Sequence, residues 1–577
     1  MRKLLTLAFF LLCPLFVLSQ DISKEARDAV SKALKEKRID ASELGSYYGL
    51  INNGKSAEVI KKLEAPGDKG VFGSANFAPS PEKPVGWRGD GSGRFPGATP
   101  PLKWGRKLDG STDNIAWIAE TPSFSGSSPV IAGNKIFITS ASCDLVCFEK
   151  KTGKMLWVKS AGFYDAATAD DRSKFPEVFK SLDMLAKLRE KMNNELPSLS
   201  EPGEVWKEGQ DKSKNILDKM DSLLTAADSE RFKIFERIDA TTTPATDGKY
   251  VYVLHNTTGI LACYDLDGNR KWLTFICDPA VKFQHHGYTS SPLLVDGKVI
   301  VFFKGYRAFD AATGKQLWSR NGAEPQGLRY GSPAAVSGRK DIFVGCTGAV
   351  FKTSDCSLYS KQNITVSESW GGGVFSDDYV AFLHARGYTE NGFKPLGWYK
   401  LPSAPSASPI TAVCPDKPGQ DMLKPEWSGN GQPIYNTFAT TPLIYGGLIY
   451  IGSEGGGYSG RGTETPFIFA YGLEKGELVY SLPADFFVQK YYSPYSVYSL
   501  QTPFSMAGGN IFVLGPLNEI IILAPGNEKK ELARNKIEMK SLSIGDKYKE
   551  WCVAPPVFEG NKIYLRSESH VYCIGKD

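Results

Sequence analysis

The sequence is poor in the residues that build metal and haem sites. It has five histidines and ten cysteines among 577 residues. There is no CxxCH motif, so covalent haem is excluded, and the CxxxC pair of Cys143 and Cys147 has no second pair at zinc-site spacing. A basic run interleaved with aromatic residues is also missing, and the formal net charge is only +5. We therefore expect neither a metal site nor a nucleic-acid partner.

After the opening segment, the sequence has no long hydrophobic run. That segment starts with Arg2 and Lys3, continues with an apolar stretch over residues 4–18, and carries Ser19 just before a cleavage point at Gln20. It is too short for a membrane span and is typical of an export signal. Residues 1–19 are therefore predicted to be a signal peptide of an exported bacterial protein, periplasmic or secreted, with no transmembrane segment. A lipoprotein signal at Cys13 fits less well.

Glycine and aromatic residues, in contrast, are plentiful, with 58 glycines and 12% aromatics. This combination favours a β-rich fold with many tight turns. The strongest feature is a repeated start of two short strands joined by a glycine turn. Clear copies begin at residues 127 (SSPVIAGNKIFI), 242, 290, 440, 501 and 554, and weaker copies begin at Gly331 and Gly372. The sequence thus contains eight such starts.

The second half of the repeat is also recognisable, as in AFDAATGKQLW over residues 308–318. Asp310 has a short acceptor side chain that can bond the turn backbone, and Gly314 can take the positive φ of a tight turn. The tryptophan that ends the unit must bury its large ring, most economically against the next unit. The predicted docking tryptophans are Trp117, Trp157, Trp272, Trp318 and Trp427.

These repeats predict an all-β fold: an eight-bladed β-propeller of four-stranded antiparallel blades over residues 102–577. The last repeat ends after its third strand. The segment around Trp117 is expected to supply the missing outer strand and close the ring, which would leave no open edge.

Three segments lie outside this pattern. Residues 20–66 have the spacing of a short helical segment, and residues 67–101 are predicted to be a Pro/Gly-rich linker. An insertion at about 165–235 has the spacing of a helical hairpin. It is interpreted either as a self-packed decoration or as an arm that docks a partner.

The frame Ala308-x-Asp310-x-x-Thr313-Gly314-Lys315-x-x-Trp318 resembles the tryptophan-docking motif of the pyrroloquinoline-quinone (PQQ)-type repeat family, and residues 86–101 resemble exported members. The family includes quinone-dependent dehydrogenases and the propeller lipoprotein of the outer-membrane β-barrel assembly machinery. The adjacent cysteines and the calcium-ligand set of many dehydrogenases have no match here. The resemblance therefore implies a binding or scaffolding protein without cofactor. The alternative is a quinoprotein oxidoreductase using PQQ and calcium.

Loops that precede the inner strands are expected to converge at one mouth of a central channel. They carry polar and aromatic residues that would form a funnel for a protein partner, for an anionic or hydroxylated ligand, or for a metal if a carboxylate joins the two histidines. These candidates are His285, His286, Arg329, Tyr330, Trp370, Tyr435, Asn436 and Tyr495. The alternative is that they only satisfy loop backbone groups. No catalytic or metal-binding residue is assigned, and a hydrolase or lyase using the two adjacent histidines is a third interpretation.

The cysteines suggest packing rather than chemistry. Cys147, Cys263 and Cys573 fall on one repeat position, where another copy has Ala308, and are interpreted as core residues. A disulfide between Cys346 and Cys356 is left open by the sequence.

Overall fold

The computed structural model describes residues 70–577, apart from short gaps and longer ones at 224–241, 277–289, 322–330, 362–371, 414–425, 453–466, 484–501 and 539–551. Eight further residues between 24 and 56 are described. The chain divides into two compact units, Met1–Val71 and Phe72–Asp577. In the first unit the eight described residues are helical, and Val30 and Ile51 among them are buried.

The second unit is built mainly from short antiparallel sheets of one design. The first sheet has the order β5 (Val130–Ala132), β6 (Lys135–Ser140), β7 (Asp144–Glu149) and β8 (Met155–Ser160). Gly133, at φ +58°, turns the chain between β5 and β6. Alternate side chains of β6 point to opposite faces, as the pleat requires. Each sheet therefore buries both faces against neighbouring sheets.

The same order recurs along the chain. The four-stranded copies are β9 (Ala245–Thr246), β10 (Tyr250–His255), β11 (Ile260–Asp265) and β12 (Arg270–Phe275); β13 (Leu293–Val295), β14 (Lys298–Phe302), β15 (Tyr306–Asp310) and β16 (Gln316–Arg320); and β27 (Leu443–Tyr445), β28 (Leu448–Gly452), β29 (Phe467–Gly472) and β30 (Leu478–Pro483).

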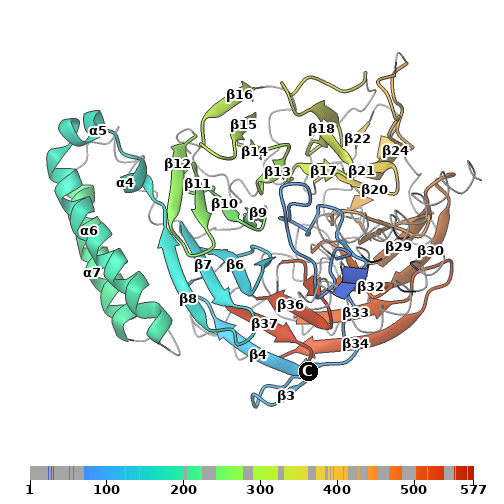
Figure 1. Ribbon diagram of the computed structural model, residues 1–577, viewed down its shortest axis with the longest axis horizontal. Helices are drawn as coiled ribbons and strands as arrows, with labels where there is room; N and C mark the ends of the chain where they lie inside the picture. Colours follow the sequence, from blue (N-terminus) through green and yellow to red (C-terminus); the bar gives the residue numbers. More distant parts are fainter. Residues whose placement is uncertain are drawn as a thin grey trace, which may run out of the picture. The chain divides into compact units, whose positions relative to one another are not determined.

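Two copies have three strands among the described residues: β17 (Ala334–Val336), β18 (Arg339–Val344) and β19 (Val350–Lys352), then β20 (Val374–Ser376), β21 (Tyr379–Leu383) and β24 (Leu396–Lys400). Two small hairpins stand apart from them, β22 (Tyr388–Thr389) with β23 (Gly392–Phe393) and β25 (Glu426–Trp427) with β26 (Pro433–Ile434). The sheets lie side by side, with their first strands toward a common centre (Figure 1).

The N-terminal part of this unit contributes strands to the last two sheets. β4 (Ile115–Glu120) is the fourth strand of the sheet formed by β35 (Val557–Glu559), β36 (Lys562–Arg566) and β37 (His570–Ile574). The predicted fourth strand around Trp117 is confirmed by this pairing. The preceding sheet contains β31 (Ser505–Ala507), β32 (Asn510–Leu514), β33 (Glu519–Leu523) and β34 (Glu531–Ile537).

That preceding sheet is extended at both edges to seven strands. β1 (Arg94–Phe95) runs parallel to its innermost strand, β31. β2 (Gly105–Arg106) pairs with its outermost strand, β34, and β3 (Thr112–Asp113) pairs with β2. The segment from Phe72 to Pro100, which includes β1, is called the plug below. It falls within the stretch that the sequence predicts to be a linker.

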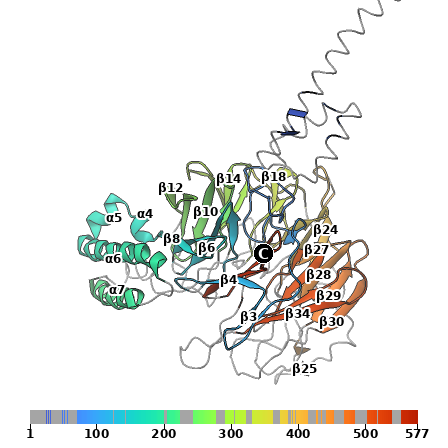
Figure 2. The ribbon, with the colours of Figure 1, turned by 60° about the horizontal axis from the view of Figure 1, so that its bottom comes forward.

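The helices of this unit belong to the insertion. They are α4 (Phe163–Ala166), α5 (Ala169–Lys174), α6 (Pro176–Glu195), a 3-10 turn (Leu196–Ser198) and α7 (Glu204–Leu223). α6 and α7 form the helical hairpin, which stands beside the first sheets in both views (Figures 1 and 2). Val178, Leu182 and Leu185 of α6 are buried on its inner face. No helix in the described part of the chain is long and apolar enough to span a membrane.

Candidate functional site around the plug

All eight loop residues predicted to form the funnel lie outside the described residues. The centre of the sheets is described, however, because the first strand of every sheet and the plug are present. We therefore build the site from these inner strands and from the residues of the plug that contact them.

Hydroxyl side chains tie the inner strands to one another. The backbone N–H of Ser128 donates to Thr243 Oγ1 (3.0 Å), that of Thr243 to Ser291 Oγ (3.0 Å), and that of Ser291 to Ser332 Oγ (2.9 Å). Each of these residues precedes the proline of a repeat start. A side-chain acceptor is needed because the inner edge of each sheet leaves backbone N–H groups without a strand partner. The second Ser/Thr of the repeat start thus links successive sheets.

The plug covers the end of the sheets where the first two strands turn. Its backbone pairs with two of these strand ends, Val85 with Thr246 (2.9 Å) and Thr99 with Gly560 (2.7 Å). Gly248, in the same turn as Thr246, and Gly508, in the turn between β31 and β32, also lie against the plug, since an added Cβ would meet Pro79 at 2.2 Å and Pro100 at 3.1 Å. The plug therefore occupies the face opposite to the loops that precede the inner strands.

Arg88 anchors the plug in the centre. Its guanidinium donates to Pro442 O and to Phe504 O, both at 3.1 Å, and these carbonyls precede β27 and β31. The side chain is 1% exposed, and burial lowers the pKa of Arg88 to about 9, with the nearby charge of Asp90 acting against this shift. Gly93, at φ +75°, is required beside it, because a Cβ there would lie 2.4 Å from the guanidinium.

Arg94 fixes the plug to the neighbouring sheets. It pairs with Asp377 and donates to Ser376 at the turn after β20, and its guanidinium lies 5.4 Å from the ring centroid of Tyr445. Trp87 packs close to Gly372, whose added Cβ would lie 3.4 Å from the indole. Arg88 is thus buried where β27 and β31 begin, whereas Arg94 and Trp87 contact the strands and loop beside it.

The docking tryptophans link the outer part of each sheet to the next one. The indole N–H of Trp117 donates to Lys150 O (3.1 Å), that of Trp272 to Ala311 O (2.9 Å), and that of Trp318 to Thr353 O (3.0 Å). Trp157 lies against Gly268, where a Cβ would approach the ring to 3.0 Å. Each indole packs on a turn of the following sheet, as the repeat predicts.

The docking of the fifth tryptophan, Trp427, stays a prediction. Trp427 lies on β25, which pairs with β26 and not with β24 among the described strands, and its side chain is not described. Trp398 of β24 was not anticipated. It is fully buried and donates to Leu473 O (2.8 Å), beside Gly476 of the next sheet.

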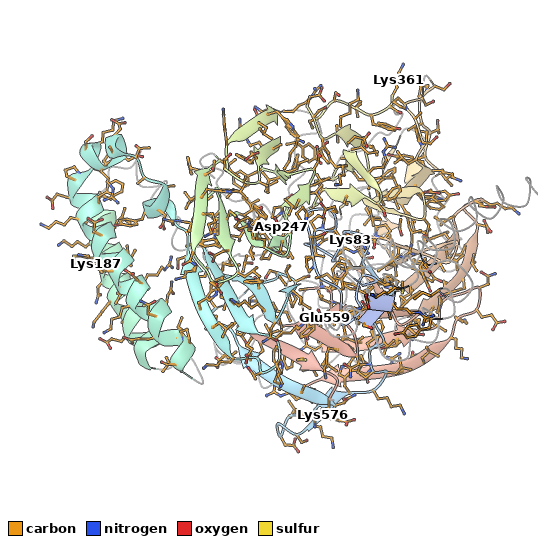
Figure 3. All side chains as sticks on the ribbon, in the orientation of Figure 1. Lys83, Lys187, Asp247, Lys361, Glu559 and Lys576 are labelled. Carbon is orange, nitrogen blue, oxygen red and sulfur yellow. The ribbon has the colours of Figure 1, made fainter. Side chains whose placement is uncertain are left out.

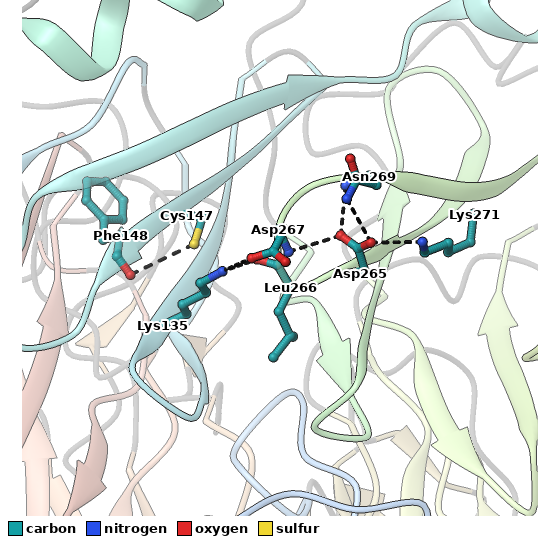
Figure 4. A network of polar contacts seen from close by, with 8 residues as sticks. All are labelled: Lys135, Cys147, Phe148, Asp265, Leu266, Asp267, Asn269 and Lys271. Carbon is teal, nitrogen blue, oxygen red and sulfur yellow. Dashed lines mark hydrogen bonds and ion pairs between the residues drawn. The ribbon is translucent and has the colours of Figure 1, made fainter.

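The turns that receive the tryptophans are held by carboxylates, as predicted for Asp310. Its Oδ1 accepts from Thr313 N (2.8 Å), and Gly314 has φ +72°. In the second sheet, Asp265 accepts from the backbone N–H of Asp267 (3.0 Å) and from Lys271 (2.8 Å), as Figure 4 shows. Burial opposes ionisation of Asp265, but these bonds outweigh it and lower its pKa. These carboxylates stabilise the turns by accepting hydrogen bonds from backbone N–H groups.

The neighbouring sheet also holds this turn. Lys135 of β6 donates to Leu266 O (2.8 Å) and pairs with Asp267 (Figure 4). Cys147, drawn in the same view, is buried beside it. The network connects the first sheet to the turn of the second.

The cysteines of the repeat lie opposite the docking tryptophans. Cys147 pairs with Trp157 and Cys263 with Trp272 in the strand registers. Burial raises the pKa of both thiols to about 12, so they stay protonated at neutral pH. This supports their interpretation as core residues.

No disulfide joins Cys346 and Cys356. In the register of β18 with β19, Val344 pairs with Val350 and Ile342 with Lys352. Cys346 follows the first of these pairs and Cys356 follows the second, so they lie at opposite ends of the hairpin. At about 3.3 Å per residue they are on the order of 10 Å apart, whereas a disulfide needs Cα atoms within about 7 Å.

A second polar cluster joins the helical hairpin to the first sheet. Arg189 of α6 lies 3.0 Å from Cys143 Sγ, and Asn193 donates to Ser160 Oγ (2.8 Å). Burial raises the pKa of the neighbouring Asp144, and it lowers that of His255 to about 3. The hairpin is therefore fixed on the sheet by partly buried polar contacts.

Comparison with known proteins identifies the repeat. Residues 201–357 match the family described as "Outer membrane protein assembly factor BamB". Over these residues the chain is similar to the PQQ-type repeat. The match includes the frame from Ala308 to Trp318 and confirms the resemblance there. No curated protein sequence matches this chain.

Several solved structures are similar to this chain at low sequence identity. BamB from Moraxella catarrhalis is 10% identical with a TM-score of 0.41, covering 80% of this chain and 97% of that chain. Quinohemoprotein alcohol dehydrogenase from Comamonas testosteroni is 11% identical with a TM-score of 0.44, covering 80% of this chain and 76% of that chain. The computationally designed Ika8 protein is 9% identical with a TM-score of 0.40, covering 80% and 100%.

Proposed function

We propose that this chain is an exported, eight-bladed propeller, closed by β4, that binds or scaffolds a partner and has no catalytic site. The export signal over residues 1–19 supports a periplasmic or secreted location. The pairing of β4 with β37 supports closure, because it gives the last sheet the outer strand that the C-terminal repeat lacks.

The observation that carries the proposal is the plug. Because Arg88, Arg94 and the plug backbone occupy the turn-side face, the face left for recognition is the one formed by the loops before the inner strands. Those loops differ from sheet to sheet in sequence and hold the eight funnel candidates. Irregular loops on a regular scaffold are where binding residues concentrate.

Site-specific photo-crosslinking tests this assignment. A photoreactive residue placed at His286, Tyr330 or Tyr435 should give adducts with a discrete partner in the cell envelope. The matched positions are Asn134, Lys249 and Ser337 in the turns, which are exposed and do not have a positive φ. Adducts from the turn positions alone, or from none of the six, would contradict the proposal.

The alternative is a quinoprotein oxidoreductase, and the described residues do not favour it. They contain no group of three or more His, Cys, Asp or Glu side chains that would hold a metal ion. Arg88 is buried where the inner strands β27 and β31 begin, which reduces the room for a flat cofactor there. We therefore propose that PQQ and calcium are not bound.

Thermal unfolding with and without PQQ plus calcium checks this point. A ligand present at 100 times its Kd stabilises the folded state by about 2.7 kcal/mol, which raises the midpoint by several degrees in a domain of ordinary size. We expect no shift and no quinone absorbance in the dialysed protein. A clear shift together with dye reduction in the presence of an alcohol would favour the oxidoreductase.

A further inference from the structure

A largely buried polar cluster lies where α6 of the helical hairpin covers the first sheet. Cys143 is in the turn between β6 and β7, and its Sγ lies 3.0 Å from Nη1 of Arg189 on α6. The next residue, Asp144, accepts from Ser160 Oγ at the end of β8. None of these residues is one of the eight loop candidates, so the cluster is independent of the function proposed above.

The charge beside Cys143 distinguishes it from the other cysteines of the first two sheets. Burial disfavours the charged form of Arg189, but Cys143 and Asp144 beside it outweigh burial and raise the pKa of the guanidinium. Arg189 therefore carries a positive charge in contact with the sulfur, which stabilises the thiolate relative to the thiol. In Cys147 and Cys263, by contrast, burial raises the pKa to about 12. Of these three cysteines, Cys143 is the one placed to react as a thiolate.

His255 of the second sheet faces the same place. Val253 and His255 lie on one face of β10, because side chains alternate along a strand, and Val253 packs in one cluster with Leu145 of β7. Cys143 stands two residues before Leu145 and so lies on the side of the first sheet that faces His255. Burial and the charge of Arg189 lower the pKa of His255 to about 3, so its imidazole is neutral at pH 7. Its side chain is 2% exposed, and its Nε2 has no hydrogen-bond partner in the described part of the chain.

We propose that Cys143 is oxidised by hydrogen peroxide to a sulfenic acid when the hairpin moves off the first sheet. The thiolate sulfur attacks one peroxide oxygen, the O–O bond breaks, and the second oxygen leaves as hydroxide, which takes a proton from solvent to become water. The sulfur loses two electrons and the peroxide gains them. Arg189 stabilises the negative charge that develops on the leaving oxygen. His255 Nε2 gives the new S–OH group a hydrogen-bond partner that the thiol does not use.

Access to the sulfur depends on the hairpin. Cys143 is fully buried, so peroxide must reach it through a local movement of the covering helix. The insertion that carries the hairpin is attached to the second sheet by the ion pair of Asp165 with Arg270 (2.7 Å), whose side chains are partly exposed. Segments held by such contacts open without global unfolding. Arg270→Gln should therefore raise the rate of oxidation several-fold. Its matched control is Arg172→Gln, which breaks the ion pair with Asp183 inside the insertion and should leave the rate unchanged.

Trapping with dimedone, a reagent for sulfenic acids, tests the proposal on the full-length mature chain. After treatment with hydrogen peroxide, peptide mass spectrometry should find a dimedone adduct on Cys143 and none on Cys147 or Cys263, which are as deeply buried. Arg189→Met should lower the rate at Cys143 by about tenfold or more, because the thiolate loses its counter-ion. Lys187→Met is the matched control: Lys187 is exposed on the same helix (Figure 3), and its loss should leave the rate unchanged.

The comparison of the three cysteines in the wild-type chain needs no variant, so it decides the outcome even if Arg189→Met fails to fold. An absent adduct on Cys143, in a protein whose urea-unfolded form gives adducts on all three cysteines, would overturn the proposal. Equal adducts on all three in the folded protein would do the same. So would faster oxidation of Cys143 in a folded Arg189→Met protein, because the arginine would then only shield the sulfur. A rate in Arg270→Gln no higher than in Arg172→Gln would overturn access through the hairpin.

Discussion

Cys573 lies directly opposite Trp117, in the pairing of the C-terminal strand β37 with the N-terminal strand β4. The indole of Trp117 continues to the first sheet, where it donates to Lys150 O and covers Gly153 at a distance that leaves no room for a Cβ. The side chain of Trp117 thus connects the last sheet, which contains β4 and β37, to the first sheet.

N-terminal truncation tests the connection between the last and the first sheet. A chain that starts at residue 72 keeps the plug and β4, and we expect it to unfold in one cooperative transition. A chain that starts at residue 121 loses the fourth strand of the last sheet and the strand beside β31. It should be insoluble or lack a cooperative transition, because both sheets would have open edges. Size-exclusion chromatography and thermal circular dichroism distinguish the two outcomes, and a native-like 121–577 protein would contradict closure by β4.

Arg88→Met should destabilise the fold by about 2–4 kcal/mol, because it leaves the buried carbonyls of Pro442 and Phe504 without their donors. The control is Arg339→Met, which breaks an exposed ion pair with Asp341 and should cost no more than about 1 kcal/mol. Urea unfolding of the three proteins measures the difference. Equal losses for the two variants would show that Arg88 does not anchor the plug.

His255 should make the fold sensitive to acid. Burial lowers its pKa from 6.5 to about 3, and the nearby Arg189 charge acts in the same direction. Between these values the unfolded chain binds a proton that the folded chain does not, so stability is complete above pH 6.5 and falls as the pH drops toward 3. The loss approaches about 1.4 kcal/mol per pH unit for this group.

His255→Leu is the test of this dependence. The buried Nε2 has no hydrogen-bond partner. Replacing the His255 imidazole by an apolar side chain should therefore change the free energy of unfolding little at pH 7. It should also reduce the loss of that free energy between pH 6 and pH 4. The measurement is the unfolding free energy in urea across this pH range. The same acid slope in both proteins would mean that other groups are responsible.

Cys263 should tolerate loss of its sulfur but not extra volume. Cys263→Ala should cost less than about 1.5 kcal/mol, since Ala308 occupies the same position opposite Trp318 in the next sheet. Cys263→Leu should cost about 1–3 kcal/mol by forcing the ring of Trp272 to move. Denaturant melts provide both values, and a leucine variant as stable as the wild type would contradict tight packing here.

The Cys263 thiol should not react with alkylating reagents in the folded protein. With a pKa of about 12, only about one molecule in 10⁴ is a thiolate at pH 8. Iodoacetamide labelling followed by peptide mass spectrometry should find Cys263 unmodified in the folded protein and modified after unfolding. Labelling in the folded protein would indicate an accessible thiol.

The sequence predicts the repeating part of this fold because the signals there are local. Alternating residues, a glycine turn and a closing tryptophan recur at each copy, and Trp117, Trp272 and Trp318 dock as expected. Trp398 was missed because it lies on the third strand of its sheet and lacks the Thr-Gly-Lys frame. Local signals fail where a copy has diverged.

The plug could not be predicted from the sequence for a different reason. Its residues have neither helical nor strand periodicity, and Pro and Gly in such a stretch indicate a linker. Its contacts are made with backbone carbonyls such as Phe504 O, and nothing in the neighbouring sequence marks these atoms as partners. The funnel residues lie outside the described part of the chain and stay a prediction.

The contacts between the N-terminal part of this unit and the last sheets also affect how the chain folds during synthesis. Arg88 bonds to Phe504, 416 residues away, and Asn114 accepts from the backbone of Lys576, 462 residues away. During synthesis the N-terminal part of a chain emerges first. The hydrogen-bonding groups of residues 72–120 therefore lack their C-terminal partners until nearly the whole chain has been synthesised. Contacts this distant in sequence slow folding and prolong the exposure of unpaired strands. Any prematurely terminated product would lack its final strands, so we expect only the finished chain to escape proteolysis.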